Sequence, residues 1–275
     1  MSNASFGGAG GTLAIFIPTN AGLVIAADKR QTPKGTFCDG ANKILIPDRP
    51  ARTAVVITGN ITLREMPDLP PAELCKFLAS TPAPIDFGRT TLAFLNAENV
   101  PLARFDGQKF TDVIYNEIEP HISGGKLSAF FGTRVAQIII ADFDPSTMKS
   151  SLLAFGIDLD GAGRFQLQPL LVTSSTTITG TSFDMQSDLV VLPFGEVPYF
   201  NQYVLAGPGQ ALLNDDYSRL RGKQKVAQVD PELALSAALN LIEATSMITE
   251  TIPAPSGIGG GSSAVLIGSE TVILR

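Results

Sequence analysis

The sequence has little of what several common classes of function require. Its 275 residues contain one histidine and two cysteines, and no apolar segment is long enough to cross a bilayer. Lys and Arg total 20 against 26 Asp and Glu, so the formal net charge is −6, and the basic residues do not cluster. Nucleic-acid binding depends on a basic surface. We therefore expect neither nucleic acid nor a membrane as a partner.

The single histidine and the two cysteines restrict the chemistry further. His121 follows Pro120 at the end of an expected helix, and no GxSxG sequence accompanies it, so a Ser-His-Asp triad has little support. We interpret His121 as a capping or surface residue. Cys38 and Cys75 can form at most one bridge and belong to no CxxC or Cys/His cluster. We expect reduced thiols and no metal site.

Two more features are missing from the chain. The N-terminus has neither the basic region nor the apolar region of a secretory signal, so we expect a cytoplasmic protein. The glycine tracts at 7–11 and 257–261 lack the lysine and the helix context of a phosphate-binding loop. No cofactor is expected.

The chain is nevertheless rich in apolar residues, at 44%, and its mean hydropathy of +0.21 supports a sizeable core. Apolar runs between turn residues predict strands, and the first four of them suggest one antiparallel block. The predicted strands cover residues 12–17, 23–28, 42–47, 53–59, 136–144, 150–158, 164–172 and 176–182, with a final hairpin after the glycine loop in 256–275. Helical spacing and caps predict helices over 70–80, 109–123, closed by Pro120 and Gly124, and 230–248.

Strands and helices thus come in blocks, which favours an α+β fold over a parallel sheet with crossover helices. The simplest packing is a four-layer αββα sandwich, in which two antiparallel sheets face each other and helices flank them. We expect one domain over residues 12–275, in which 185–228 is an irregular insertion containing a broken helix.

The most specific pattern lies in the first sixty residues. Thr12 stands ten residues before Gly22 and sixteen before Asp28, and an Asn-Lys-apolar run at Lys43 and a Thr-Gly step at Gly59 follow. This pattern resembles the proteasome β-subunit-like family and its bacterial relatives, which are N-terminal nucleophile (Ntn) hydrolases of the threonine type. The order of the later helices, strands and glycine loop also agrees with that family.

The resemblance implies roles for these residues. Thr12 would be the nucleophile, Asp28 and Lys43 its charged partners, and Gly59 the donor to an oxyanion. It also implies that the backbones of Gln31 and Thr32 pair with an extended peptide substrate and that Thr181 supports the nucleophile. Family members commonly form homo-oligomers, so the resemblance implies that copies of this chain assemble into a ring or a filament. Each residue also has a plainer interpretation as a turn, an edge charge or a strand end.

The chemistry can be argued without the family. A threonine hydroxyl needs a base, and an N-terminal α-amine, with a pKa of about 7.7 to 8, can act as one. Thr12 supplies both groups only if residues 1–11 are removed, and this small, flexible, Gly-rich segment suits a propeptide cleaved at Gly11–Thr12. The resulting hypothesis is a threonine peptidase, and the resemblance implies that it matures by cleaving this bond itself.

Two alternatives remain open at this point: an inactive structural subunit that keeps its prefix, and an amidase of the same superfamily that acts on small molecules. Some residues depart from the family pattern. Pro255 and Ile258 stand where the family has an Asp and a Ser that help to position the nucleophile's amine, and Leu13 stands where a second Thr is frequent. A second alignment would put Thr12 third and a glycine at the nucleophile position, which predicts an inert protein.

Overall fold

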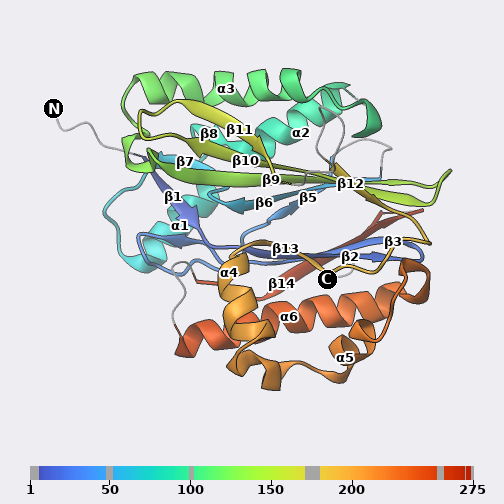
Figure 1. The fold of residues 1–275 in the computed structure, drawn as a ribbon. Coiled ribbons are helices and arrows are strands. Elements are labelled where there is room, and N and C mark those ends of the chain that lie inside the picture. Colours follow the sequence, from blue (N-terminus) through green and yellow to red (C-terminus); the bar gives the residue numbers. More distant parts are fainter. Residues whose placement is uncertain are drawn as a thin grey trace.

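The computed structural model describes residues 6–47, 52–98, 102–170, 180–252, 257–269 and 271–273. These residues form an α+β fold with two large antiparallel sheets that face each other and helices on their outer faces (Figure 1). The predicted α+β class and the antiparallel pairing are therefore confirmed.

One large sheet has five strands in the order β13-β2-β3-β14-β15. The strands span Leu192–Gly195 (β13), Leu13–Thr19 (β2), Gly22–Asp28 (β3), Ser262–Gly268 (β14) and Thr271–Ile273 (β15). Gly22 opens β3 with a φ of +143°, and a Cβ there would lie 2.2 Å from the backbone oxygen of Ile267. The close approach of β14 therefore requires glycine at this turn.

The other large sheet has the order β11-β10-β9-β6-β5, and β12 also pairs with β10. The strands span Phe165–Pro169 (β11), Lys149–Leu159 (β10), Thr133–Asp144 (β9), Thr53–Gly59 (β6), Ile44–Leu45 (β5) and Gly180–Phe183 (β12). The expected four-stranded opening block is wrong, because β2 and β3 belong to one sheet while β5 and β6 belong to the other. These strands are buried on both faces, so their apolar pattern cannot indicate which sheet each joins.

A third, smaller sheet has the order β4-β1-β7-β8. Its strands span Thr32–Pro33 (β4), Phe6–Gly10 (β1), Thr62–Glu65 (β7) and Ile85–Asp86 (β8). The expectation that the prefix is flexible is therefore wrong for Phe6–Gly10, because both edges of β1 find partner strands.

Side-chain alternation along β2 explains how the layers pack. Leu13, Ile15 and Ile17 belong to the cluster of buried apolar side chains that contains α6 residues, whereas Ala14 and Phe16 belong to the cluster between the two sheets. A third cluster joins the outer face of the six-stranded sheet to α2 and α3. Each sheet thus buries both faces, one against the other sheet and one against helices.

The helices only partly match their sequence signals. They span Pro71–Ser80 (α1), Phe87–Glu98 (α2), Gly107–Ser123 (α3), Val197–Tyr199 (α4), Asp215–Arg221 (α5) and Pro231–Thr251 (α6). The start of α6 is confirmed by its cap, in which the Asp230 side chain accepts a hydrogen bond from the backbone of Leu233 at 2.8 Å. α2 was not predicted. Pro120 does not end α3, because its carbonyl still accepts the N–H of Gly124, at 3.1 Å.

The irregular stretch 185–228 contains short helical segments, as the broken-helix prediction expects. Besides α4 and α5, they are a π-helical segment (Phe200–Leu205) and the 3-10 segments Pro208–Leu212 and Val226–Gln228. The prediction missed β13, an edge strand of four residues that pairs with the start of β2. Two further 3-10 turns, Leu102–Arg104 and Ser128–Phe130, flank α3.

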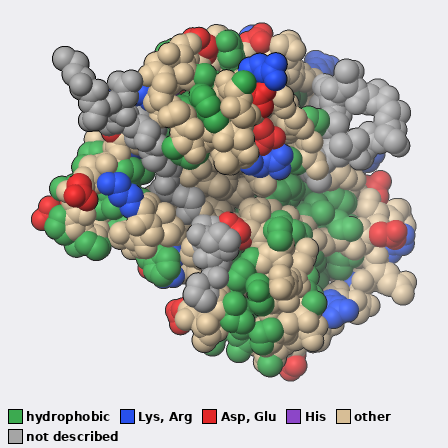
Figure 2. Space-filling model, turned by 60° about the vertical axis from the view of Figure 1, so that its left-hand side comes forward, with side chains coloured by type: hydrophobic (Ala, Val, Ile, Leu, Met, Phe, Trp, Pro, Cys, Tyr) green, Lys and Arg blue, Asp and Glu red, His purple; other side chains and the backbone are tan. Residues whose placement is uncertain are grey.

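The distribution of charged side chains and the apolar character of the helices bear on the sequence-based expectations of no nucleic acid, membrane or metal. On the face shown in Figure 2, Lys and Arg side chains lie singly among Asp and Glu side chains. Among the described residues, none of the helices is both long and apolar enough to cross a membrane. In the same part of the chain, no group of three or more His, Cys, Asp or Glu residues is arranged to hold a metal ion.

Candidate functional site

The carbonyl oxygen of Gly11 lies at the centre of the candidate site. It accepts a hydrogen bond from the Thr12 hydroxyl at 2.7 Å and another from the Lys43 ammonium, also at 2.7 Å. Lys43 donates in addition to Asp28 Oδ1 at 2.9 Å. The fold therefore brings Thr12, Lys43 and Asp28, which the sequence places up to 31 positions apart, to one peptide bond.

Asp28 organises this site through both of its oxygens. Oδ1 accepts from the backbone of Leu13 at 2.9 Å as well as from Lys43, and Oδ2 accepts from the backbones of Arg30 and Gly259 at 3.2 Å each. The side chain is fully buried. A buried carboxylate needs such donors in place of water, and here they come from four separate segments.

Burial also governs Lys43, whose side chain is 0% exposed. Loss of hydration lowers the pKa of Lys43, and the adjacent Asp28 carboxylate opposes this shift. The ammonium therefore lies in a water-poor environment, where its attraction for a carbonyl oxygen is stronger than at the surface.

Strand pairing explains why these residues meet. Thr12 precedes β2 and Asp28 ends β3, and the antiparallel register that pairs Ala14 with Ala27 brings these two ends together. Lys43 comes from the other sheet: it precedes β5, and its carbonyl accepts the N–H of Ile57 on β6 at 3.3 Å. The pair Lys43–Asp28 thus links the two sheets on one side of β2.

Gly59 ends β6 beside this site and has a φ of +77°. A Cβ there would approach the backbones of Val135 and Ala136 to 3.2 and 3.3 Å. The glycine is thus required by its backbone conformation. The donor role that the resemblance implies for Gly59 stays a prediction.

A second set of residues lies beside Thr12, and no sequence pattern indicated them. The backbone N–H of Glu196 donates to the Thr12 carbonyl at 3.0 Å. A Cβ on Gly195 would lie 1.9 Å from that carbonyl oxygen and 3.5 Å from Thr58 Cβ, so β13 presses directly against the start of β2. Gln137 Oε1 accepts from both Thr58 Oγ1 and the Gly195 N–H, at 2.9 and 3.3 Å.

Gln31 and Thr32 lie at the edge of the site, next to the prefix. The N–H and the carbonyl of Gln31 both pair with Cys38, at 2.8 Å each, which closes a loop. Thr32 pairs with Gly10 of β1. The prefix itself therefore occupies the position beside Thr32 that the resemblance assigns to an extended peptide.

Thr181 lies elsewhere. Its register partner is Leu152, which pairs with Ala141, and Ala141 pairs with Ala54 on β6. Ala54 and Gly59 are five positions apart on this strand, which at about 3.4 Å per residue is roughly 17 Å. The register therefore does not bring Thr181 to the nucleophile, and its suggested supporting role is not met by the fold.

The expectation of reduced thiols is wrong, because Cys38 and Cys75 form a disulfide. The bond ties the loop that follows Gln31 to α1, and these segments are too far apart in sequence for spacing to indicate their contact. In the same loop, Arg30 pairs with Asp39 at 2.8 Å and lies over the ring of Phe37. The loop beside Asp28 is therefore held by a covalent bond and an ion pair.

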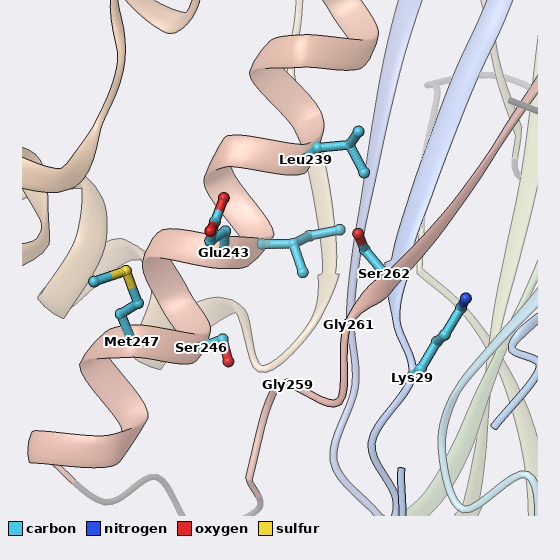
Figure 3. A pocket seen from close by; sticks show the side chains of 9 residues that line it. Lys29, Leu239, Glu243, Ser246, Met247, Gly259, Gly261 and Ser262 are labelled. Carbon is cyan, nitrogen blue, oxygen red and sulfur yellow. The ribbon is translucent and has the colours of Figure 1, made fainter. Parts of the chain in front are cut away.

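A cavity of about 590 Å³ lies behind the glycine loop, between α6 and the start of β14 (Figure 3). Lys29, Glu243, Ser246 and Ser262 contribute its polar groups. Gly259 lines this cavity while its N–H donates to Asp28, so the loop separates the cavity from the candidate site. Ile258 is fully buried in the α6 cluster, and Pro255 lies outside the described residues.

Known proteins offer only a distant likeness. No family model matches the chain, and no curated protein matches it. Similar solved structures include Anbu, described as an ancestral beta-subunit, from Yersinia bercovieri (12% identity, TM-score 0.46, 96% of this chain and 87% of that chain). Two others are Anbu from Hyphomicrobium sp. strain MC1 (13%, 0.42, 96% and 85%) and its Gly-1 mutant (14%, 0.44, 96% and 87%). TM-scores below 0.5 are too low for any residue's role to pass from those proteins to this chain.

Proposed function

We propose that this chain is a proteasome-like Ntn hydrolase of four-layer αββα fold that cleaves its own Gly11–Thr12 bond and then hydrolyses peptide amide bonds. One observation carries the proposal: the Gly11 carbonyl oxygen accepts hydrogen bonds from both the Thr12 hydroxyl and the Lys43 ammonium. The hydroxyl supplies a nucleophile beside that carbonyl, and the buried cation can stabilise the negative charge that develops on its oxygen.

In the self-cleavage step, Thr12 Oγ1 attacks the carbonyl carbon of Gly11, and negative charge develops on the oxygen that Lys43 holds. The C–N bond then breaks, the hydroxyl proton ends on the nitrogen of Thr12, and Gly11 is left as an ester on Oγ1. Water hydrolyses that ester. The products are a prefix that ends in a carboxylate and a Thr12 with a free α-amine.

The freed α-amine then acts as the base for a substrate. Its pKa of about 7.7 to 8 allows it to take the hydroxyl proton near neutral pH. Thr12 Oγ1 attacks the substrate carbonyl, and the Gly59 N–H stabilises the oxyanion. The amine of the substrate's cleaved peptide bond then leaves with the proton. Water releases the acyl group and restores Thr12.

The prefix supports a peptide as the substrate. β1 pairs with β4 through Gly10 and Thr32, and with β7 through Gly8 and Leu63, so an extended chain fits between two strand edges. Such pairing recognises any extended backbone and leaves specificity to side chains. Once the prefix has left, a peptide can take its place.

The same observation also favours the second candidate function, a structural subunit that keeps its prefix, because β1 is built into a sheet on both edges. Assembly of copies into a ring or filament stays a prediction from the resemblance.

Disulfides persist mainly in oxidising compartments, so the Cys38–Cys75 bond argues against a cytoplasmic location.

Intact-mass measurement of the purified chain tests the proposal. We expect wild type to begin at Thr12 and to hydrolyse Phe-Gly-Gly-Ala-Gly-Gly-aminomethylcoumarin, whose acyl part copies residues 6–11. Thr12→Ala should keep all residues and be inactive. The matched control Thr133→Ala, at a hydroxyl that bonds only locally to Phe130, should be cut like wild type. An uncut, inactive wild type that still assembles would establish the structural subunit instead.

A further inference from the structure

The side chain of Gln137 joins β6 of one sheet to β13 of the other, beside Thr12, through hydrogen bonds. It lies on β9 directly opposite Thr58 of β6. Its Oε1 accepts from Thr58 Oγ1 at 2.9 Å and from the Gly195 N–H at 3.3 Å. A single amide oxygen therefore contacts both sheets.

The two donors flank the nucleophile. Gly195 pairs with Leu13, the residue after Thr12, and the N–H of Glu196 holds the Thr12 carbonyl at 3.0 Å. On the other side, Thr58 immediately precedes Gly59, the proposed oxyanion donor. A continuous set of contacts thus runs from Gly59 through Gln137 to Thr12.

Hydrolysis requires the distance between the Thr12 hydroxyl and the Gly59 N–H to be set accurately. The sheets otherwise face each other through apolar side chains such as Phe16, Ile139 and Leu152. Apolar burial is not directional, so a small slide of one sheet changes it little. A misplacement of about 1 Å at the reacting atoms can reduce a rate by about 100-fold. Hydrogen bonds are directional and resist such a slide.

Lys43–Asp28 already links the sheets on the β3 side of β2. At the opposite end of β6, Arg52 Nε donates to the carbonyl of Ser269, which follows β14, at 2.6 Å. The Gln137 contact adds a link on the β13 side, at the end of β6 that holds Gly59. We propose that Gln137 is a positioning residue of the hydrolytic site, which holds the Thr58–Gly59 step in register with Thr12. This inference rests on the proposed function.

Three variants and a control test this role. Gln137→Met removes the acceptor with little change in size, Gln137→Glu keeps an acceptor oxygen, and Thr58→Val removes one donor. Gln168→Met is the matched control, because Gln168 lies exposed on β11 and bonds only to Gln166. For each variant we would measure kcat and KM on Phe-Gly-Gly-Ala-Gly-Gly-aminomethylcoumarin, the fraction cut by intact mass, and the urea unfolding midpoint.

We expect Gln137→Met and Thr58→Val to lower kcat by about 10-fold to 100-fold while KM changes by less than about twofold. Gln137→Glu should retain kcat to within about threefold, and Gln168→Met should match wild type. A Gln137→Met enzyme with wild-type kcat would overturn the role, as would equal losses in the Met and Glu variants. An uncut and inactive wild type would overturn the proposed function itself and this role with it.

Discussion

Asp28 and Glu117 are both carboxyl groups inside this molecule, yet their surroundings differ. Asp28 accepts four hydrogen bonds through its two oxygens, one of them from the Lys43 ammonium. Glu117, on α3, accepts the Asp86 N–H at 2.7 Å with Oε1, but its buried Oε2 has no partner among the described residues. Burial raises the pKa of Glu117.

The difference shows what makes a buried carboxyl useful to a site. The donors to Asp28 come from β2, from the glycine loop, from the residue before β5 and from its own strand end, so one charge gathers four segments around Thr12. In the described part of the chain, Glu117 receives donors only from the start of α2, namely the Asp86 N–H and the Thr90 hydroxyl, and burial disfavours its charged form. The first group organises a site, whereas the second only caps the start of α2.

Removing the Asp28 charge should have the largest effect. Asp28→Asn leaves the fully buried Lys43 ammonium without its carboxylate, so we expect the free energy of unfolding to fall by about 3–5 kcal/mol. Urea unfolding at neutral pH measures this loss. Asp158→Asn is the control, because its partner Arg134 is 41% exposed, and such a pair contributes less than about 1 kcal/mol.

A double variant sharpens the same point. Asp28→Asn combined with Lys43→Met removes both charges, so it should be more stable than Asp28→Asn alone. If the single variant proves as stable as wild type, Asp28 would be no more important to the fold than a surface carboxylate, and the contrast with Glu117 would fail.

Breaking the cross-link beside Asp28 should have the next largest effect. Cys75→Ser opens the bond between the loop after Gln31 and α1, and we expect a loss of about 2–4 kcal/mol. Reduction of wild type should give the same loss, and the variant should not respond to reductant. Hydrogen exchange should accelerate at the Gln31 amide, which pairs with Cys38, and not at the Asp86 amide beside Glu117. Uniform acceleration would contradict a local role.

Glu117→Gln should have the smallest effect, and its sign should depend on pH. Because the pKa of Glu117 is raised in the folded state, its contribution to stability is present below the ordinary pKa of about 4.3 and is lost as pH rises through the raised value. The variant should therefore match wild type near pH 4 and be more stable near pH 7.5. Half-burial limits the gain to well under about 1.4 kcal/mol.

Urea unfolding of both proteins at the two pH values measures this difference. The control is Asp112→Asn on the exposed side of α3, whose carboxylate bonds to Gln108. It should show no comparable gain with pH. A Glu117→Gln protein that is less stable than wild type at pH 7.5 would show that Glu117 is held in its charged form.

Particular residues show how far sequence reasoning reached. The resemblance carried by the spacing of Thr12, Asp28 and Lys43 selected three groups that the structure brings together: Thr12 and Lys43 donate to the Gly11 carbonyl, and Asp28 accepts from Lys43. The same reasoning placed Thr181 beside them, which the strand register does not. A Gly-Thr-Ser triplet carries no information about which end of a sheet it joins, whereas Thr12 and Asp28 lie at the ends of two strands joined by a short turn.

Local order in the chain determined most strands of the two large sheets and the α6 helix with its Asp230 cap, because periodicity, capping and turn residues act between near neighbours. Tertiary structure alone decided which sheet each strand joined, that Cys38 meets Cys75, that the prefix lies between β4 and β7, and that Gln137 reaches Gly195. These contacts join segments far apart in sequence, and their energy depends on how whole layers pack, which no local pattern records.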